Sequence, residues 1–457
     1  MDLTEQAIER DGMAIPRRYW AYGAIIITLI LAVMDASVAN VALPTIARDF
    51  HATPSQSITI VSVYQLVIVI LLLPLAALGD IYGYRRVYST GVAVFTLASL
   101  CCACAWSLDL LTAARILQGI GAAGIMSVNT ALIRYIFPSA KLGQALGLNT
   151  LAVGVASSLG PSFAGVVLAI ASWHWLFAVN VPLGIVAYLL GVKTLPDSRR
   201  APQRFDIISA LLSAVMFTLL LGCIDSLSRG ASWPRTVAEL AIGLAAALWA
   251  IRRQLDRPAP LLPIDLLKIP VFALSMGTSV CSFCAQMLAF VSLPFMLQTG
   301  LKFSPTTVGF LMVPWPLAVA VCAPIAGRLS DRFSSAILGF VGLLLLVAGL
   351  LFLAFLPAHA SLANIVWRMA LCGAGFGTFQ APNNRTIVTS APRIRSGAAS
   401  GMLGTARLLG QALGAALVAL ILAHIAAPEG ARVSLLAGAA FAFVAAVVSI
   451  ARHGKGA

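Results

Sequence analysis

Residues 76–86 read AALGDIYGYRR, and residues 327–334 read GRLSDRFS, so a leucine, a small residue and an aspartate recur in the same order. The two aspartates of this shared core, Asp80 and Asp331, lie 251 residues apart. A second pair has nearly the same spacing: Arg115 opens the run RILQGIG, and Arg368 precedes three glycines 253 residues farther on. Two pairs at nearly one offset indicate that half of the chain is repeated.

The segments around these motifs are strongly apolar. The chain has 457 residues, of which 60% are hydrophobic and 10% charged, with a mean hydropathy of +0.95. Soluble proteins carry about 25% charged residues. We count fourteen apolar runs of the roughly 20 residues that a membrane helix needs. The sequence therefore predicts an all-α polytopic membrane protein with 14 transmembrane helices.

The repeat also predicts how these helices are grouped. If the two central helices and their loops, residues 207–268, are set aside, the offset falls to about 190 residues, the length of six helices with short loops. We therefore expect two six-helix halves with two extra helices between them. The predicted boundaries are a cytoplasmic tail at 1–19, a half at 20–194, a two-helix insert with cytoplasmic flanking loops at 195–268, a half at 269–451, and a cytoplasmic tail at 452–457.

The net charge of +14 reports topology rather than a nucleic-acid partner. If the N-terminus is cytoplasmic, most of the 30 basic residues fall in loops on the cytoplasmic side, as the positive-inside rule requires. We expect a multi-pass protein of the bacterial inner or plasma membrane, with both termini in the cytoplasm. The polar start and the length of the first apolar run predict that no signal peptide is cleaved.

The cysteines and histidines form no pattern typical of a metal site. All eight cysteines lie in apolar segments, and the five histidines are scattered near loops. The pair Cys281 and Cys284 has no second pair and no nearby histidine, so we expect no metal ion and no cofactor. We also find no nucleophile and base in a catalytic arrangement, and predict that the chain is not an enzyme.

Asp35 is the one acid well inside an apolar run, the first, which extends from about Trp20 to Leu43. A charge at mid-bilayer costs roughly 2.5–3.5 kcal/mol on insertion scales, which favours a functional role over an aspartate capped by polar neighbours. Asp35 lies eight residues from the predicted outer end of its run, and Arg115 lies seven residues from the outer start of the fourth. At 1.5 Å per residue, both are about 10–12 Å deep.

Arg115 would favour the charged form of Asp35 when the two are close, and their separation would let Asp35 take up a proton. A purely structural ion pair is the alternative. We add Asn40 and Gln118 to the predicted proton-coupling and substrate cavity.

These stretches resemble the major facilitator superfamily, and specifically its fourteen-helix drug:proton antiporter branch. The loop at 76–86 is similar to the motif G-x-L-a-D-r-x-G-r-r, with Ala76, Ile81 and Tyr84 as departures, and the copy at 327–334 has Ser334 in place of a glycine. The stretch 35–44 resembles the first-helix motif of that branch, and WHWLFAVNVPLG at 173–184 is similar to its W-R-W-I-F-x-x-N-x-P-x-G segment. The fifth run resembles the antiporter motif through Gly147, Gly160, Pro161 and Gly165, while Ala156 and Ala164 replace glycines.

The resemblance implies roles for these residues. In the family, the first and fourth helices line the central cavity, and the antiporter motif seals one side of it and is associated with export. The loop motif is thought to latch the two halves, and here it would comprise Asp80, Gly83, Arg85, Arg86, Asp331 and Arg332; Arg85 and Arg86 serving only as topology anchors is an equal alternative.

The predicted function is proton-driven efflux of lipophilic, preferentially cationic drugs or toxic compounds by a monomer. The alternatives are a narrow-specificity exporter of a metabolite or antibiotic and, remotely, a non-transporting receptor on a transporter scaffold.

Overall fold

The computed structural model describes residues 12–138, 141–198, 205–228, 230–255, 264–330, 332–357, 360–391 and 396–452. The regular secondary structure of these residues is entirely helical. The first group of helices comprises α2 (Arg17–Asp49), α3 (Pro54–Tyr82), α4 (Tyr84–Ala103), α5 (Leu108–Ile136), α6 (Leu142–Ile170), α7 (His174–Ala178) and α8 (Asn180–Thr194). A hairpin of α9 (Ile207–Ser228) and α10 (Trp233–Leu255) follows. The last group comprises η2 (Ile264–Lys268), α11 (Pro270–Phe295), η3 (Met296–Gly300), α12 (Pro305–Met312), α13 (Pro314–Leu329), α14 (Ser335–Ala354), α15 (Leu362–Ser390), α16 (Ser396–His424) and α17 (Ala427–Ala451).

Several of these helices begin where the sequence supplies a capping side chain. The Thr53 hydroxyl accepts a hydrogen bond from the backbone of Gln56, whose own side chain accepts one from the Thr53 backbone, so α3 opens with a capping box. Ser107, Ser304 and Ser361 cap α5, α12 and α15 in the simpler way, through one hydroxyl each. The long apolar runs are thus divided into helices by short polar breaks.

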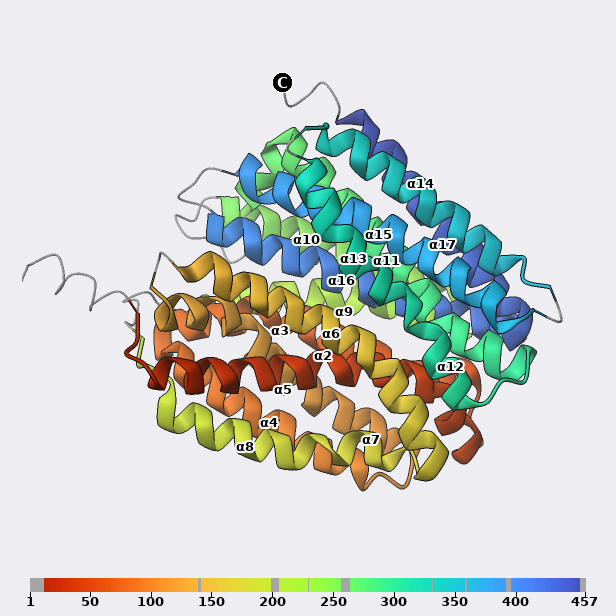
Figure 1. Cartoon of the computed structure of the whole chain (residues 1–457), viewed down its shortest axis with the longest axis horizontal. Helices are drawn as coiled ribbons and strands as arrows, with labels where there is room; N and C mark the ends of the chain where they lie inside the picture. Colours follow the sequence, from red (N-terminus) through yellow and green to blue (C-terminus); the bar gives the residue numbers. More distant parts are fainter. Residues whose placement is uncertain are drawn as a thin grey trace, which may run out of the picture.

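The helices pack as two groups with the hairpin beside them (Figure 1). Helices α2 to α8 pack on one another, and so do α11 to α17. The α9–α10 hairpin contacts both groups, because α9 lies against α3 of the first and α16 of the second. The predicted fold class is therefore confirmed: two six-helix groups plus two extra helices.

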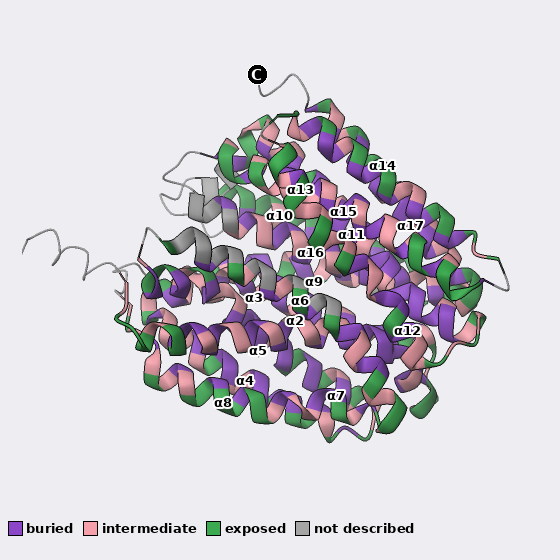
Figure 2. Ribbon diagram, in the orientation of Figure 1, coloured by how far each residue is buried: buried purple, intermediate pink, exposed green. Residues whose placement is uncertain are grey.

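The outer faces of this bundle suit a lipid environment. Within the described residues, twelve helical segments are long and apolar enough to cross a membrane, and α6 and α15, at 29 residues each, complete the two groups. Figure 2 shows exposed residues along peripheral helices such as α8 and α14, whereas α2, α5 and α11 are largely buried. The exposed residues are often large and apolar, as Leu183 and Leu189 of α8 illustrate. Such a surface would be a liability in water and is expected in a bilayer.

The two groups meet closely at one end of the bundle. We call it the distal end; it carries the loops before α3 and α12, and the opposite, terminal end carries the start of α2 and the end of α17 (Figure 1). At the distal end, a buried apolar cluster joins residues of both groups, including Leu43 and Val291. Towards the terminal end, Gly23 of α2 and Gly277 of α11 face open space, because a Cβ atom on either would meet no atom of a neighbouring element within 4 Å. The bundle is therefore closed distally.

One predicted boundary is wrong in a way that matters for the site. The first helix does not end near Leu43 but continues through Pro44 to Asp49. Asp35 is consequently fourteen residues from its distal end, rather than eight. A proline removes one backbone hydrogen bond and need not end a helix whose turns are packed on both sides of it.

Candidate functional site

Asp35 lies at the centre of a polar cluster inside the first group of helices. Its side chain is 1% exposed, and one carboxylate oxygen accepts a hydrogen bond from the Arg115 guanidinium. The other oxygen accepts two hydrogen bonds, from the amide nitrogens of Gln118 at 2.9 Å and of Asn180 at 3.1 Å. Both oxygens are thus occupied by donors from α5 and α8, which is what a buried carboxylate requires to remain charged.

Arg115 is fully buried and is held on several sides. Its Nη1 also donates to Gln118 Oε1 at 2.6 Å, and its Nε donates to the carbonyl oxygen of Ile60 at 3.2 Å. The guanidinium carbon lies 4.0 Å from the centre of the Tyr64 ring and 5.6 Å from that of Phe177. Contacts of a guanidinium with aromatic faces add favourable cation–π energy, so the arginine is fixed in place as well as paired.

The α7–α8 segment supplies a wall of this cluster through one helical face. The Trp173 indole donates to Asp49 at 2.9 Å, Phe177 faces Arg115, and Asn180 donates to Asp35. Positions 173, 177, 180 and 184 are spaced three or four residues apart, and the last, Gly184, packs against Thr96 of α4. Residues of WHWLFAVNVPLG that share one helical face therefore make the contacts that build the site.

Three of the four residues predicted for the proton-coupling and substrate cavity come together. Asp35, Arg115 and Gln118 are in mutual contact. Asn40, five residues along α2, is buried, and its Oδ1 has no hydrogen-bond partner within the described part of the chain. Asn180 belongs to the cluster although it was not predicted as a site residue.

The antiporter-motif helix α6 lies between the two groups at the distal end. A Cβ atom on Gly160 would collide with Ser37 of α2, and Gly309 of α12 packs against the carbonyl oxygen of Pro161. A Cβ atom on Gly165 would lie 3.0 Å from the Cα of Thr306, whose hydroxyl donates to the Gly165 carbonyl oxygen at 2.9 Å. The small residues thus permit backbone contact between the groups. For Gly147, the structure describes only its position in α6.

The loop between α3 and α4 makes its described side-chain contacts within the first group. Gly83 has a φ of 100°, which allows the sharp turn, and the hydroxyl of Tyr84 donates to Asp80. Arg85 donates to the carbonyl oxygen of Val192 and forms an ion pair with Asp197 at 3.3 Å, beyond the end of α8.

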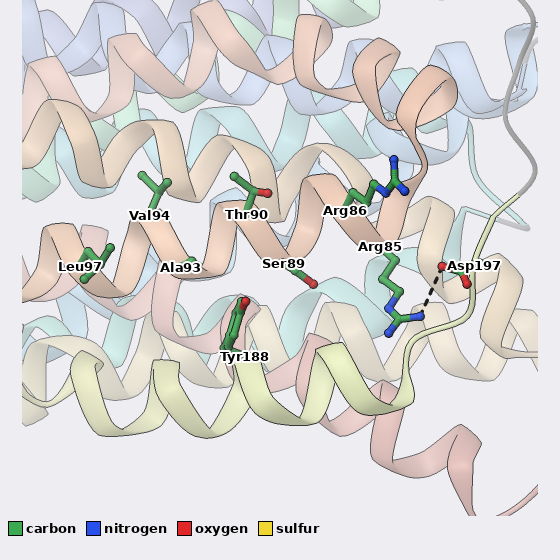
Figure 3. Close-up of a pocket in the computed structure, with 9 residues that line it drawn as sticks. All are labelled: Arg85, Arg86, Ser89, Thr90, Ala93, Val94, Leu97, Tyr188 and Asp197. Carbon is green, nitrogen blue, oxygen red and sulfur yellow. Dashed lines mark hydrogen bonds and ion pairs between the residues drawn. The ribbon is translucent and has the colours of Figure 1, made fainter.

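The same loop borders a groove of about 500 Å³ between α4 and α8, which Figure 3 shows with Arg85 directed at Asp197 and Arg86 on the other side. This groove lies on a different side of α4 from the Asp35 cluster. Arg332 is exposed, and Asp331 lies outside the described residues. The predicted contact of this loop with the second group therefore stays a prediction.

No group of three or more histidine, cysteine or acidic side chains able to hold a metal ion occurs in the part of the chain that the structure describes. The cluster around Asp35 is built from one acid, one base and amides. What it can do chemically is hold a buried carboxylate in place through three side-chain donors.

Comparison with known proteins places this arrangement in a family. The chain is 54% identical over 444 residues to the uncharacterized transporter YebQ of Escherichia coli, covering 97% of each chain. It is 32% identical over 394 residues to the riboflavin transporter RibZ of Clostridioides difficile, covering 86% of this chain and 85% of that protein. It is 31% identical over 401 residues to the multidrug resistance protein Stp of Mycobacterium tuberculosis, covering 86% and 74%. The family model of the Major Facilitator Superfamily matches residues 25–415 and 278–453. The chain therefore belongs to the Major Facilitator Superfamily and is a multi-pass membrane transporter.

Proposed function

We propose that this transporter exports lipophilic small molecules in exchange for protons, as a member of the fourteen-helix drug:proton antiporter branch. The observation that carries the proposal is the buried pair of Asp35 and Arg115, with Gln118 and Asn180 as further donors to the carboxylate. A charged pair inside a membrane bundle costs free energy, so a functional role would explain why it is present. Proton coupling supplies one.

The coupling step follows from the contacts of Asp35. While Arg115, Gln118 and Asn180 all donate to the carboxylate, it is held in the charged form. A rearrangement of α2 against α5 and α8 would remove these donors and leave a desolvated carboxylate, which then takes up a proton. Protonation on one side of the membrane and deprotonation on the other would link the proton gradient to the change of access.

The arrangement of the two groups fits such a cycle. The small-residue contacts of α6 with α2 and α12 close the distal end, while Gly23 and Gly277 face open space nearer the terminal end. We assign the terminal end to the cytoplasm of a bacterial inner membrane, because the basic loops lie there. The conformation is then inward-facing, and the loop with Asp80 and Arg85 would contact the second group only when that end closes.

The sequence predicted cationic substrates, and the contacts of Asp35 do not support that preference. A single deep carboxylate suits a cationic substrate, but it also suits a proton site that never touches the substrate. Both oxygens of Asp35 are occupied by protein donors. We therefore assign Asp35 to protons and not to substrate cations.

A narrow-specificity exporter is the second candidate. The multidrug resistance protein Stp and the riboflavin transporter RibZ are equally similar to this chain, at 31% and 32% identity. The two candidates share the proton cycle and differ in the breadth of substrates.

Efflux from cells that express the protein tests the proposal. The readout is gradient-driven extrusion of a panel of fluorescent dyes, ethidium among them, before and after the pH gradient is collapsed. We expect efflux of at least one dye that stops with the gradient and is lost in Asp35→Asn. Efflux of several unrelated dyes supports the multidrug reading, whereas efflux confined to one chemical type supports the narrow one. Extrusion that continues after the gradient is collapsed would contradict proton coupling.

A further inference from the structure

Arg407 is a cation within the membrane bundle that pairs with none of the described residues. It lies in α16, eleven residues from Ser396 and seventeen from His424, so it is about 16 Å from one helix end and about 25 Å from the other. Its side chain is half-buried, and it makes no hydrogen bond or ion pair with any residue that the structure describes. Two other arginines of the membrane helices do have partners: Arg115 donates to Asp35, and Arg368 donates to the carbonyl oxygen of Phe352.

The packing of α16 shows which way Arg407 faces. Cβ atoms on Gly410 and Gly414 would lie 2.5 Å and 2.7 Å from carbonyl oxygens of α11, so this face of α16 touches α11. A Cβ atom on Gly404 would have Leu72 of α3 as its nearest neighbour, at 3.9 Å. Residue 407 is three from 404 and from 410 and seven from 414, which places it between these two faces. Arg407 therefore lies in the angle between α3 of the first group and α11 of the second.

Open space lies beside α11 at the level of Arg407. Helices α16 and α11 run in parallel, and Gly410 meets α11 at Val280. One turn earlier, Arg407 is therefore level with Gly277, where a Cβ atom would face open space. Its pseudo-equivalent in the first group, Gly23, is equally open and lies 254 residues earlier, at the spacing of the internal repeat. Arg407 is thus level with open space beside α11, towards the terminal end and away from the closed distal end.

No acid in the described part of the chain forms an ion pair with Arg407. Asp35 is the one acid near the middle of a described membrane helix, and its oxygens are held by Arg115, Gln118 and Asn180. Further polar groups nevertheless lie near the same level. Gln411 is one turn from Arg407 on α16, and Gln65, two turns from Leu72 on α3, is 3% exposed with an Oε1 that has no partner in the described structure. An unpaired cation beside buried amides is costly unless water or an incoming anion satisfies it.

We propose that Arg407 binds a carboxylate group of the transported molecule, with Gln411 and Gln65 as flanking hydrogen-bonding groups. The substrates are then lipophilic organic anions. This inference rests on the proposed transport function and names its substrate class. Arg407 acts in substrate binding, whereas Asp35 serves the proton.

Binding of two dyes that share a skeleton tests the assignment without requiring transport. The purified full-length protein in nanodiscs of neutral lipid is titrated with fluorescein, a xanthene with a free carboxylate, and with its uncharged-carboxyl counterpart, fluorescein methyl ester. Anisotropy gives the dissociation constants. We expect the wild type to bind fluorescein at least tenfold more tightly than the ester. A charge-assisted hydrogen bond to a buried group supports a difference of this size.

Variants then assign the preference to one side chain. Arg407→Gln should weaken fluorescein binding at least tenfold and leave ester binding within about twofold, while Arg407→Lys should retain most of the preference. Arg134→Gln, which changes an exposed arginine at the end of α5, is the matched control and should bind as the wild type does.

Three results would overturn the proposal: no fluorescein binding to the wild type, equal binding of dye and ester, or an unchanged preference in Arg407→Gln. The comparison of fluorescein with its ester on the wild-type protein tests the proposal even if a variant does not fold. Fluorescein binding that depends on Arg407, in a protein without gradient-driven transport, would refute the proposed function and leave this site standing.

Discussion

Gly165 of α6 and Thr306 of α12 join the two halves of the transporter backbone to backbone at the distal end. The Thr306 hydroxyl donates to the Gly165 carbonyl oxygen at 2.9 Å, and a Cβ atom on Gly165 would lie 3.0 Å from the Cα of Thr306. Because α12 begins at Pro305, capped by Ser304, its first turn is fixed in the position where α6 meets it.

Gly165→Val should therefore force the halves apart at the distal end. Overpacking a tight contact costs about 1–3 kcal/mol. Here it would destabilise only the conformation in which the distal end is closed. We expect a cysteine placed at the buried position Ala164, in a background without the native cysteines, to react faster with an impermeant maleimide added from the distal side.

Gly222→Val is the matched control, because this glycine of α9 has open space where a Cβ atom would lie. It should leave the labelling rate unchanged. Equal labelling of Ala164→Cys with and without Gly165→Val would show that this contact does not hold the distal end closed.

Arg115→Gln should destabilise the protein by more than the loss of one hydrogen-bonded contact would. It leaves Asp35 buried with an unpaired charge, and breaking one partner of a buried pair costs about 3–5 kcal/mol. Adding Asp35→Asn to Arg115→Gln removes that charge, so the double variant should recover much of the lost thermal stability in detergent. It should recover no proton-driven transport. A double variant that is less stable than Arg115→Gln would mean that the two side chains do not depend on each other.

The stability that Asp206 gives to the α9–α10 hairpin should depend on pH. Although burial opposes it, hydrogen bonds from the Ser209 hydroxyl at 2.8 Å and backbone at 3.2 Å, together with Arg253 at 3.2 Å, lower the pKa of Asp206. A carboxylate with a depressed pKa in the folded state contributes stability above its ordinary pKa of about 3.8 and loses it as the pH falls through the lower value.

Hydrogen exchange of the first-turn amides of α9 measures this contribution. Asparagine can still cap the helix, so near pH 7 Asp206→Asn removes mainly the charge at the start of α9. It should speed exchange by up to about fivefold, the equivalent of roughly 0.3–1 kcal/mol for a charge at a helix N-terminus. The difference from the wild type should vanish when both are measured well below pH 3.8. A difference that persists unchanged in acid would assign the effect to packing rather than to the charge.

The sequence predicted the fold better than it predicted the members of the site. Hydrophobic run length and the internal repeat determine the number and grouping of helices, because each helix must span a bilayer. The pairing of Asp35 with Arg115 followed from the rarity of charges in apolar runs, although the depth argument behind it used the wrong end for α2. The depth was counted from the end of the apolar run near Leu43, whereas α2 continues through Pro44 to Asp49.

Asn180 was missed for a reason that the chain itself contains. The residues Trp173, Phe177, Asn180 and Gly184 repeat at helical spacing, and this periodicity predicts a single buried face with one polar member. Which buried acid the amide reaches depends on how α8 packs against α2, and one sequence does not encode that in a readable pattern. The contact of Gly165 with Thr306 could not be predicted for the same reason.

The most direct test of the account is transport by Asp35→Asn in proteoliposomes under an imposed pH gradient, with substrate exchange measured in parallel at equal pH. The account predicts that the variant loses gradient-driven accumulation and still exchanges labelled for unlabelled substrate, because the substrate pathway does not use Asp35. Accumulation of substrate against its gradient by Asp35→Asn, driven by protons as in the wild type, would contradict the assignment of Asp35 as the proton carrier.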